Sequence, residues 1–256
     1  MRFDVVTLFP ELFTAFLTTG VTRRAYESGL VDVHLTSPRD FTDGNYKRVD
    51  DRPFGGGPGM VMLAEPLSRC VNNVFEQRLQ RPPVLLFSPI GNAINHSMVA
   101  RWAASEGAVL ICGRYEGIDQ RFIDEYVTEQ VSLGDFVLSG GEIAAMALLD
   151  AVARLQPGVL NAEGSHEQDS FNPKLDGLLD CPHYTRPEVW HDVKVPAVLL
   201  SGHHVQIERW RRDQGLLTTA QNRPDLIERA RLSNHLKKQD ELILAAQLLS
   251  KAPSNQ

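Results

Sequence analysis

The sequence is poor in cysteine and in long apolar runs, and each shortage excludes a class of protein. Its three cysteines, Cys70, Cys112 and Cys181, lie far apart and form no CxxC pair. This argues against a disulfide framework or a zinc ribbon and suits a reducing compartment. No apolar run approaches about 20 residues, and the N-terminal segment lacks the pattern of a signal peptide. We therefore expect a cytoplasmic protein with no membrane partner.

Positive charge is also scarce, because 26 Lys and Arg face 32 Asp and Glu, for a formal net charge of −6. The deficit is uneven: residues 203–238 hold eight Lys or Arg against four Asp or Glu. A local excess of this kind can contact phosphates whatever the total charge. Such a run is more commonly a solvated helix surface, and charge alone favours that interpretation.

Apolar patterning predicts an α/β domain in the first part of the 256-residue chain. Apolar or alternating runs indicate strands at 2–9, 31–35, 84–89, 108–117 and 136–142. Four helices are expected. One follows Pro10, one runs from Leu67 to Gln80, one lies around Met98 to Trp102, and one runs from Glu142 to Gln156. Strands that alternate with helices predict a mostly parallel sheet with helices on both faces.

The last part of the chain has a different character. Periodicity is lost over the polar residues 159–187, which indicates a linker, and helical patterns return at 204–214, 224–232 and 236–250. A small helical domain follows from these patterns. We therefore divide the chain into an α/β domain at 1–160, a mobile linker at 161–175 and a helical domain at 176–256.

The glycine-rich stretch RPFGGGPGM (52–60) belongs to a long polar loop. It lacks the Lys-Ser or Lys-Thr of a phosphate-binding Walker motif, and its glycines are spaced wrongly for the GxGxxG of a dinucleotide site. A flexible linker would be longer and would contain serine. These mismatches weaken a kinase or GTPase interpretation.

Three other loops follow expected strands and carry glycine or proline, at 88–89, 113–117 and 139–142. Ligands of open α/β sheets bind at this carboxyl edge, although ordinary tight turns remain the alternative. The loops hold Glu116, Asp135 and Glu142 against Arg114, a poor set for a polyphosphate. An acidic, backbone-rich pocket suits S-adenosylmethionine, which lacks phosphates and carries a positive sulfonium.

Five stretches together resemble the bacterial TrmD family of tRNA (guanine-37-N1)-methyltransferases, in the SPOUT superfamily. They are DDRPFGGGPGM (50–60), ICGRYEGIDQR (111–121), SLGDFVLSGGE (132–142), EQDSF (167–171) and LLDCPHYTRPEVW (178–190). The resemblance runs through nearly the whole chain. It implies a deep trefoil knot that holds S-adenosylmethionine, and a homodimer with the active site at the subunit interface. It also implies a tRNA substrate with guanine at position 37, and Mg²⁺ as a further cofactor.

The resemblance also implies roles for individual residues. Asp169 would be the general base that removes the N1 proton of guanine, and Arg154 would support O6. The cofactor would contact Phe87, Ser88, Pro89, Gly113, Tyr115, Glu116, Leu133, Gly134, Asp135, Phe136, Val137, Leu138, Gly140 and Gly141. The tRNA would contact Asp50, Arg52, Gly59 and Arg114, and the basic segment adds Arg209, Arg211 and Arg212. No metal ligands are identified.

Two departures and several alternatives belong with these expectations. Leu133 and Phe136 stand where the family pattern has Ile and Tyr, so Phe136 lacks a hydroxyl. Without the resemblance, Asp169 would be an ordinary linker carboxylate and Arg154 a solvated helix residue. The remaining alternatives are a SPOUT methyltransferase that acts on another RNA position and a non-catalytic RNA-binding module.

Overall fold

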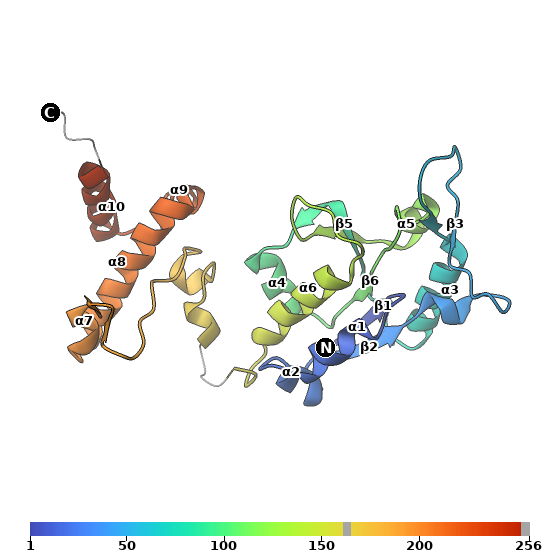
Figure 1. The fold of residues 1–256 in the computed structure, drawn as a ribbon, viewed down its shortest axis with the longest axis horizontal. Helices are drawn as coiled ribbons and strands as arrows, with labels where there is room; N and C mark the ends of the chain where they lie inside the picture. Colours follow the sequence, from blue (N-terminus) through green and yellow to red (C-terminus); the bar gives the residue numbers. More distant parts are fainter. Residues whose placement is uncertain (161–164, 252–256) are drawn as a thin grey trace. The chain divides into compact units, whose positions relative to one another are not determined.

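The computed structural model describes residues 1–160 and 165–251, which fall into two units, 1–161 and 162–256 (Figure 1). Residues 161–164 of the expected linker lie outside the described residues. Each unit has its own buried core.

A five-stranded sheet organises the first unit, with strand order β2-β1-β6-β5-β7. All four neighbouring pairs are parallel, which confirms the predicted mostly parallel α/β architecture. The strands are β1 (Arg2–Val6), β2 (Asp32–Thr36), β5 (Val84–Ala93), β6 (Val109–Ile111) and β7 (Glu129–Ser132). The pairing of β5 with β7 is irregular, because its register shifts between Phe87 and Asn92.

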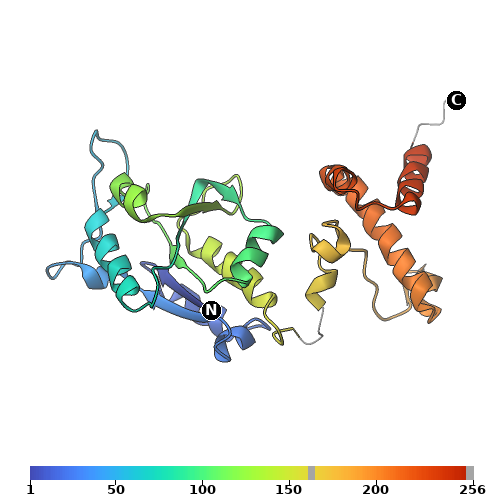
Figure 2. The same ribbon diagram turned by 180° about the vertical axis from the view of Figure 1, so that it is seen from behind.

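Helices cover both faces of this sheet (Figures 1 and 2). One face packs against α1 (Leu12–Thr18), α2 (Arg23–Glu27), α4 (His96–Ala103) and α6 (Glu142–Arg154). The other packs against α3 (Ala64–Glu76) and α5 (Gln120–Tyr126). Because side chains alternate along a strand, β1 sends Phe3 and Val5 to the first cluster and Val6 to the second.

One predicted strand is wrong. Residues 136–138 form an irregular loop rather than a strand, and Val137 is 85% exposed. The strand of this region is instead β7, whose edge position lets the polar residues Glu129 and Gln130 remain half-buried. A short apolar run between glycines cannot be told from a buried strand by composition.

The glycine-rich stretch connects two short strands, β3 (Asp50–Asp51) and β4 (Val61–Met62), which pair antiparallel. Positive φ angles occur at Gly55, Gly56, Gly57 and Gly59. Residues other than glycine rarely adopt this backbone conformation. The glycines therefore serve the turn itself. Before the hairpin lies the 3₁₀ helix η1 (Pro38–Phe41).

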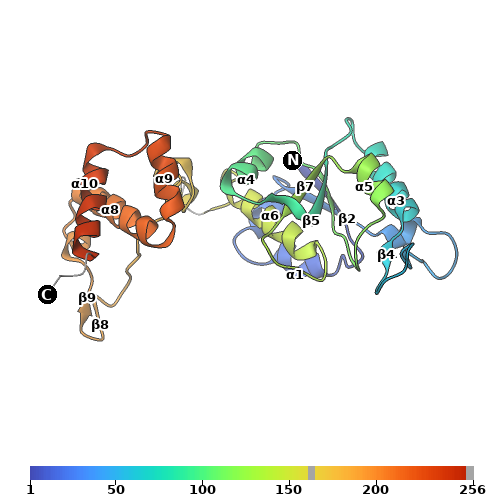
Figure 3. The same cartoon turned by 90° about the horizontal axis from the view of Figure 1, so that it is seen from above.

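The second unit is mostly helical (Figure 3). Its elements are η2 (Ser165–Gln168), η3 (Pro173–Leu175), β8 (Val189–Trp190), β9 (Val193–Lys194), α7 (Ala197–Leu200), α8 (His204–Asn222), α9 (Pro224–Leu232) and α10 (Lys238–Lys251). Its buried core is small and comprises Leu178, Leu216, Leu226, Ile227, Ala230 and Leu244. Across the described residues of both units, no helix combines the length and apolarity needed to cross a bilayer.

Candidate functional site

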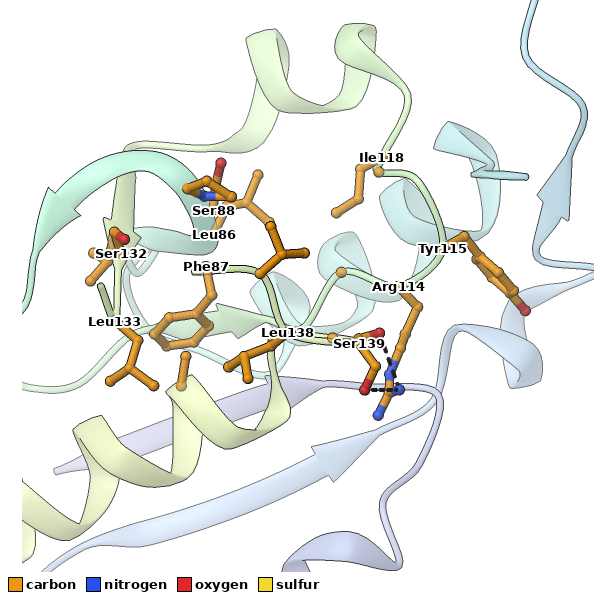
Figure 4. A pocket seen from close by; sticks show the side chains of 18 of the residues that line it. Leu86, Phe87, Ser88, Arg114, Tyr115, Ile118, Ser132, Leu133, Leu138 and Ser139 are labelled. Carbon is orange, nitrogen blue, oxygen red and sulfur yellow. Dashed lines mark hydrogen bonds between the residues drawn. The ribbon is translucent and has the colours of Figure 1, made fainter. Parts of the chain in front are cut away.

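A cavity of about 260 Å³ opens where β6 and β7 end, beside the register shift of β5 between Phe87 and Asn92 (Figure 4). Its walls come from residues 86–89, 113–118, 131–134 and 136–141, with Ile123 and Ala144 beside them. The three stretches that the sequence singled out therefore meet at one cavity, but the loop predicted at 88–89 is wrong, because Ser88 and Pro89 lie within β5 where its pairing with β7 is irregular. The cavity lies at the position at which open α/β sheets bind ligands.

Nearly all residues predicted to contact a cofactor line this cavity. The exception is Asp135, which lies outside the lining although Gly134 and Phe136 belong to it. Leu86, Val131 and Ile118 also line the cavity, and sequence reasoning missed them because they look like ordinary core residues. The wall is thus largely main chain and apolar side chains.

Glycines bring the strand ends and the start of α6 into contact. The Gly141 N–H donates to the Gly113 carbonyl at 3.1 Å, and a Cβ on Gly141 would lie 2.8 Å from Cys112 Cα. A side chain at position 141 would therefore push α6 away from β6. This contact places the N-terminus of α6 at the cavity.

The thiol of Cys112, which is buried behind this contact, is unreactive at neutral pH. Burial, and then the nearby Glu142 carboxylate, raise the pKa of Cys112 well above its ordinary value. Since the thiolate is the nucleophilic form of cysteine, Cys112 is a packing residue here.

Arg114 and Glu142 form an ion pair at the rim of the cavity. Arg114 Nε donates to Glu142 Oε1 at 3.1 Å, and Arg114 Nη2 lies 3.0 Å from Glu142 Oε2. The Thr7 hydroxyl donates to Glu142 Oε1 at 2.8 Å. Arg114 Nη1 donates to the Ser139 carbonyl at 3.2 Å, and Figure 4 shows its side chain directed toward Ser139. Glu142, which the sequence suggested as part of an acidic pocket, is therefore buried and paired with the positive charge of Arg114.

Glu116 is also a lining carboxylate, and its side chain is exposed. Its loop is fixed against the glycine-rich hairpin, since the Glu116 N–H donates to the Met60 carbonyl at 3.0 Å. A Cβ on Gly59 would lie 2.4 Å from Glu116 Cγ. Gly59 thus lies next to the cavity wall.

Asp50 and Arg52, both predicted to contact tRNA, lie at the base of the glycine-rich hairpin. Asp50 is half-buried in β3 and Arg52 is exposed. Arg48 forms an ion pair with Asp51, whose carboxylate also accepts the Arg52 N–H at 2.8 Å. These contacts fix the main chain of the hairpin and leave the predicted roles of Asp50 and Arg52 as predictions.

The two predicted catalytic residues belong to different units. Arg154 is the last residue of α6 in the first unit. Asp169 directly follows η2 in the second unit, is half-buried, and donates its N–H to the His166 carbonyl at 3.2 Å. The buried Asn172 closes the same turn, because its side-chain amide donates to that carbonyl at 2.9 Å. Both catalytic roles stay predictions.

Two of the three predicted basic contacts are already engaged within the second unit. Arg212 lies 2.8 Å from Asp176 and 3.1 Å from Asp240, and Arg209 lies 3.0 Å from Asp240. Arg211 is exposed. Arg209 also pairs with the nearby Asp213, but Asp176 and Asp240 lie 28 or more residues from these arginines and outside residues 203–238, so the charge count of that segment could not reveal them.

Within residues 1–160 and 165–251, no group of three or more His, Cys, Asp or Glu side chains is arranged to hold a metal ion. The Mg²⁺ that the resemblance implies therefore has no candidate ligand set in that part of the chain.

The chain is similar in sequence to known proteins along most of its length. The family described as tRNA (Guanine-1)-methyltransferase TrmD matches residues 1–229. The chain is 72% identical to the tRNA (guanine-N(1)-)-methyltransferase of Albidiferax ferrireducens over 97% of this chain and 100% of the relative. It is 68% identical to the enzyme of the same name from Paracidovorax citrulli, over 96% of this chain and 98% of the relative.

Proposed function

Because the chain belongs to the tRNA (Guanine-1)-methyltransferase TrmD family, we propose that it methylates N1 of guanine at position 37 of tRNA, with S-adenosylmethionine as methyl donor. Membership makes the chain a tRNA methyltransferase that acts on N1 of guanine. The donor, the position and the residue roles are our proposal. The cavity formed by three stretches at the end of the sheet is the observation that carries it.

The cavity suits an adenosyl group with a sulfonium. Apolar side chains such as Leu86 and Leu138 would cover the adenine ring, and main-chain groups of the glycine loops would bind its polar edges. Glu116 offers negative charge at the rim, whereas a phosphate-binding site would need unpaired cations there. When bound, S-adenosylmethionine supplies an electrophilic methyl group. Arg114 is already paired with Glu142 and provides no such cation.

Guanine N1 carries a proton at neutral pH, so the reaction needs a base. We assign this role to Asp169, whose carboxylate would accept the N1 proton as N1 attacks the methyl carbon, while the bond between that carbon and the sulfonium sulfur breaks and leaves the neutral thioether S-adenosylhomocysteine. Removal of the proton moves negative charge onto O6, which the Arg154 guanidinium would stabilise. Together these two side chains would make N1 nucleophilic without a change in the cofactor pocket.

Further parts of the proposal concern assembly and topology. Val137, Ile90, Phe136 and Ile143 are large apolar side chains exposed on the first unit, and exposed apolar side chains of this kind support burial against a second copy. The homodimer would place its active site at that interface. The bridge between Arg114 and Gly140 brings the segments after β6 and before α6 side by side at the cavity, where the proposed trefoil knot would lie.

The helical unit would contact the tRNA. The exposed Arg211 on α8 supports this assignment, together with Lys237 and Lys238, which are also exposed. Phosphate contacts of this kind orient a nucleic acid and carry little sequence information. The choice of guanine would therefore depend on the groups around N1 and O6.

Transfer of labelled methyl to unmodified tRNA transcripts tests the proposal, with G37 and A37 transcripts as a matched pair. We expect label at position 37 of the G37 transcript and none in the A37 transcript. Equal labelling of both transcripts would indicate a different RNA position. Failure of the protein to bind S-adenosylmethionine in a calorimetric titration would instead indicate a non-catalytic RNA-binding module.

A further inference from the structure

We propose that Arg114 is a positioning residue, which together with Glu142 holds residues 139–141 in the shape that binds the methyl donor. The inference rests on the proposed function of the cavity, and it replaces the expected contact between Arg114 and tRNA.

The guanidinium of Arg114 has its donors directed inward. Two of its nitrogens meet the two oxygens of Glu142, and a third donates to the Ser139 carbonyl. Its carbon lies 4.5 Å from the centre of the Phe9 ring. The side chain is only 18% exposed, so a phosphate could recruit it only by breaking this arrangement.

Glu142 requires a partner of this kind. Its side chain is 1% exposed, and a buried carboxylate without compensation is strongly destabilising. Thr7 donates one hydrogen bond to it, and its place in the first turn of α6 adds the favourable helix dipole. Arg114 supplies the full positive charge, so Glu142 depends mainly on Arg114.

The pair joins two segments at the cavity, because Arg114 follows β6 and Glu142 begins α6. Thr7, which follows β1, supports Glu142 from outside the cavity lining. Gly140 lies against the pair, because a Cβ there would be 2.3 Å from Arg114 Nε and 2.5 Å from Glu142 Oε2. Loss of either charge would therefore release residues 139–141, of which all three line the cavity.

Three variants test this coupling: Arg114→Met, Glu142→Gln and the double variant. Each single variant leaves one buried charge without its partner, whereas the double variant is neutral. We expect each single variant to bind S-adenosylmethionine about 10- to 100-fold more weakly, within the range for coupled neighbours, and the double variant to recover most of the loss. Arg101→Met is the matched control, since the Arg101 side chain is 53% exposed and the half-buried Glu129 stays open to water, so this ion pair should matter little.

Amide hydrogen exchange over residues 133–145 gives a second readout that needs no ligand. We expect faster exchange in both single variants and near-normal exchange in the double variant. If wild-type protein fails to bind S-adenosylmethionine, the proposed function fails. Amide exchange in the variants still tests whether the ion pair of Arg114 with Glu142 holds the loop. Should Arg114→Met not fold, Arg114→Lys keeps the charge without the planar fork, and its affinity should fall between those of wild type and Glu142→Gln.

Two results would overturn the inference. One is unchanged donor affinity and exchange in the Arg114 variants, combined with weaker tRNA binding and a shallower salt dependence, which would make Arg114 a phosphate contact. The other is a double variant whose loss of affinity equals the sum of the two single losses, which would mean that the two side chains act independently.

Discussion

Glu142 and Asp240 are both buried carboxylates, each with a side chain 1% exposed, but they lie in units built differently. Glu142 meets one arginine in a unit with two large apolar clusters. Asp240 meets Arg209 and Arg212 in a unit whose apolar core is small. The first unit can therefore use its ion pair to shape a cavity. In the second unit, the ion pairs of Asp240 join α8 to α10 beside the apolar contacts of Leu216 and Leu244.

This difference changes how the basic segment, residues 203–238, should be interpreted. Arg209, Arg212, Arg223 and Arg231 all have acidic partners within the second unit. A count of charges along the sequence thus overstates the positive charge that faces a nucleic acid. Of the three arginines of the second unit predicted to bind tRNA, Arg209, Arg211 and Arg212, Arg211 is the exposed one.

The largest expected effect is on the rate of methyl transfer, and it distinguishes the roles of the two units. Asp169→Asn in the second unit should lower the single-turnover rate of methyl transfer by roughly 10²- to 10⁴-fold, the usual contribution of a general base. Affinity for S-adenosylmethionine should stay near wild type, because the cavity lies in the first unit. Single-turnover kinetics beside calorimetry measures both. Near-normal turnover would remove Asp169 from the mechanism.

The next effect concerns stability. Asp240→Ala should destabilise the helical unit by about 3 kcal/mol, the low end for breaking a buried pair, because both arginines keep a second acidic partner. It also removes an acceptor for the Lys237 N–H at the start of α10. Amide exchange of α8 and α10 in the full chain measures this loss.

Glu241→Ala is the control for that change, because the ion pair of Glu241 with Arg231 is exposed and should contribute less than about 1 kcal/mol. Equal effects of the two variants would contradict the contrast between buried and exposed pairs.

A smaller effect is expected for tRNA affinity. Arg211→Gln should reduce the slope of log affinity against log salt by about 0.7–0.9, the contribution of one phosphate contact. Gln221→Glu, an exposed position on the same helix, makes the same change in net charge elsewhere. Equal salt slopes in the two variants would mean that net charge matters and the position of Arg211 does not.

The smallest effect is a pH dependence of the helical unit. Burial opposes ionisation of Asp240, but the Lys237 N–H and then Arg212 and Arg209 outweigh it, so the pKa of Asp240 is lowered. A lowered folded-state pKa contributes stability above the unfolded value of about 3.9, and this is lost as pH falls through the folded value. Acid titration followed by amide exchange should show α10 opening below about pH 4. Asp240→Asn should flatten this response.

Sequence patterns predicted the layers of the first unit because its apolar periodicity is local. The buried runs near Val84 and Val109 and the helix from Glu142 all form as expected. The strand predicted at 136–142 was wrong because burial on a sheet is decided by tertiary packing. Glycine and proline positions located the cavity loops, since these residues mark turns whatever their neighbours.

The ion pairs could not be predicted in the same way. Arg114 and Glu142 are 28 residues apart, and so are Arg212 and Asp240. Their meeting depends on how strands and helices pack, which no local spacing encodes. The sequence therefore showed which charges are present but left their partners open.

The strand order of the sheet has a consequence for synthesis of the chain. β1 lies between β2 and β6, and its Asp4 pairs with Val109. At about 5–20 residues per second, a ribosome takes roughly 5–20 s to add the hundred or so residues that separate these two strands. During that interval β1 has one neighbouring strand at most, so the nascent first unit leaves a strand edge and apolar side chains uncovered, which favours aggregation at that stage.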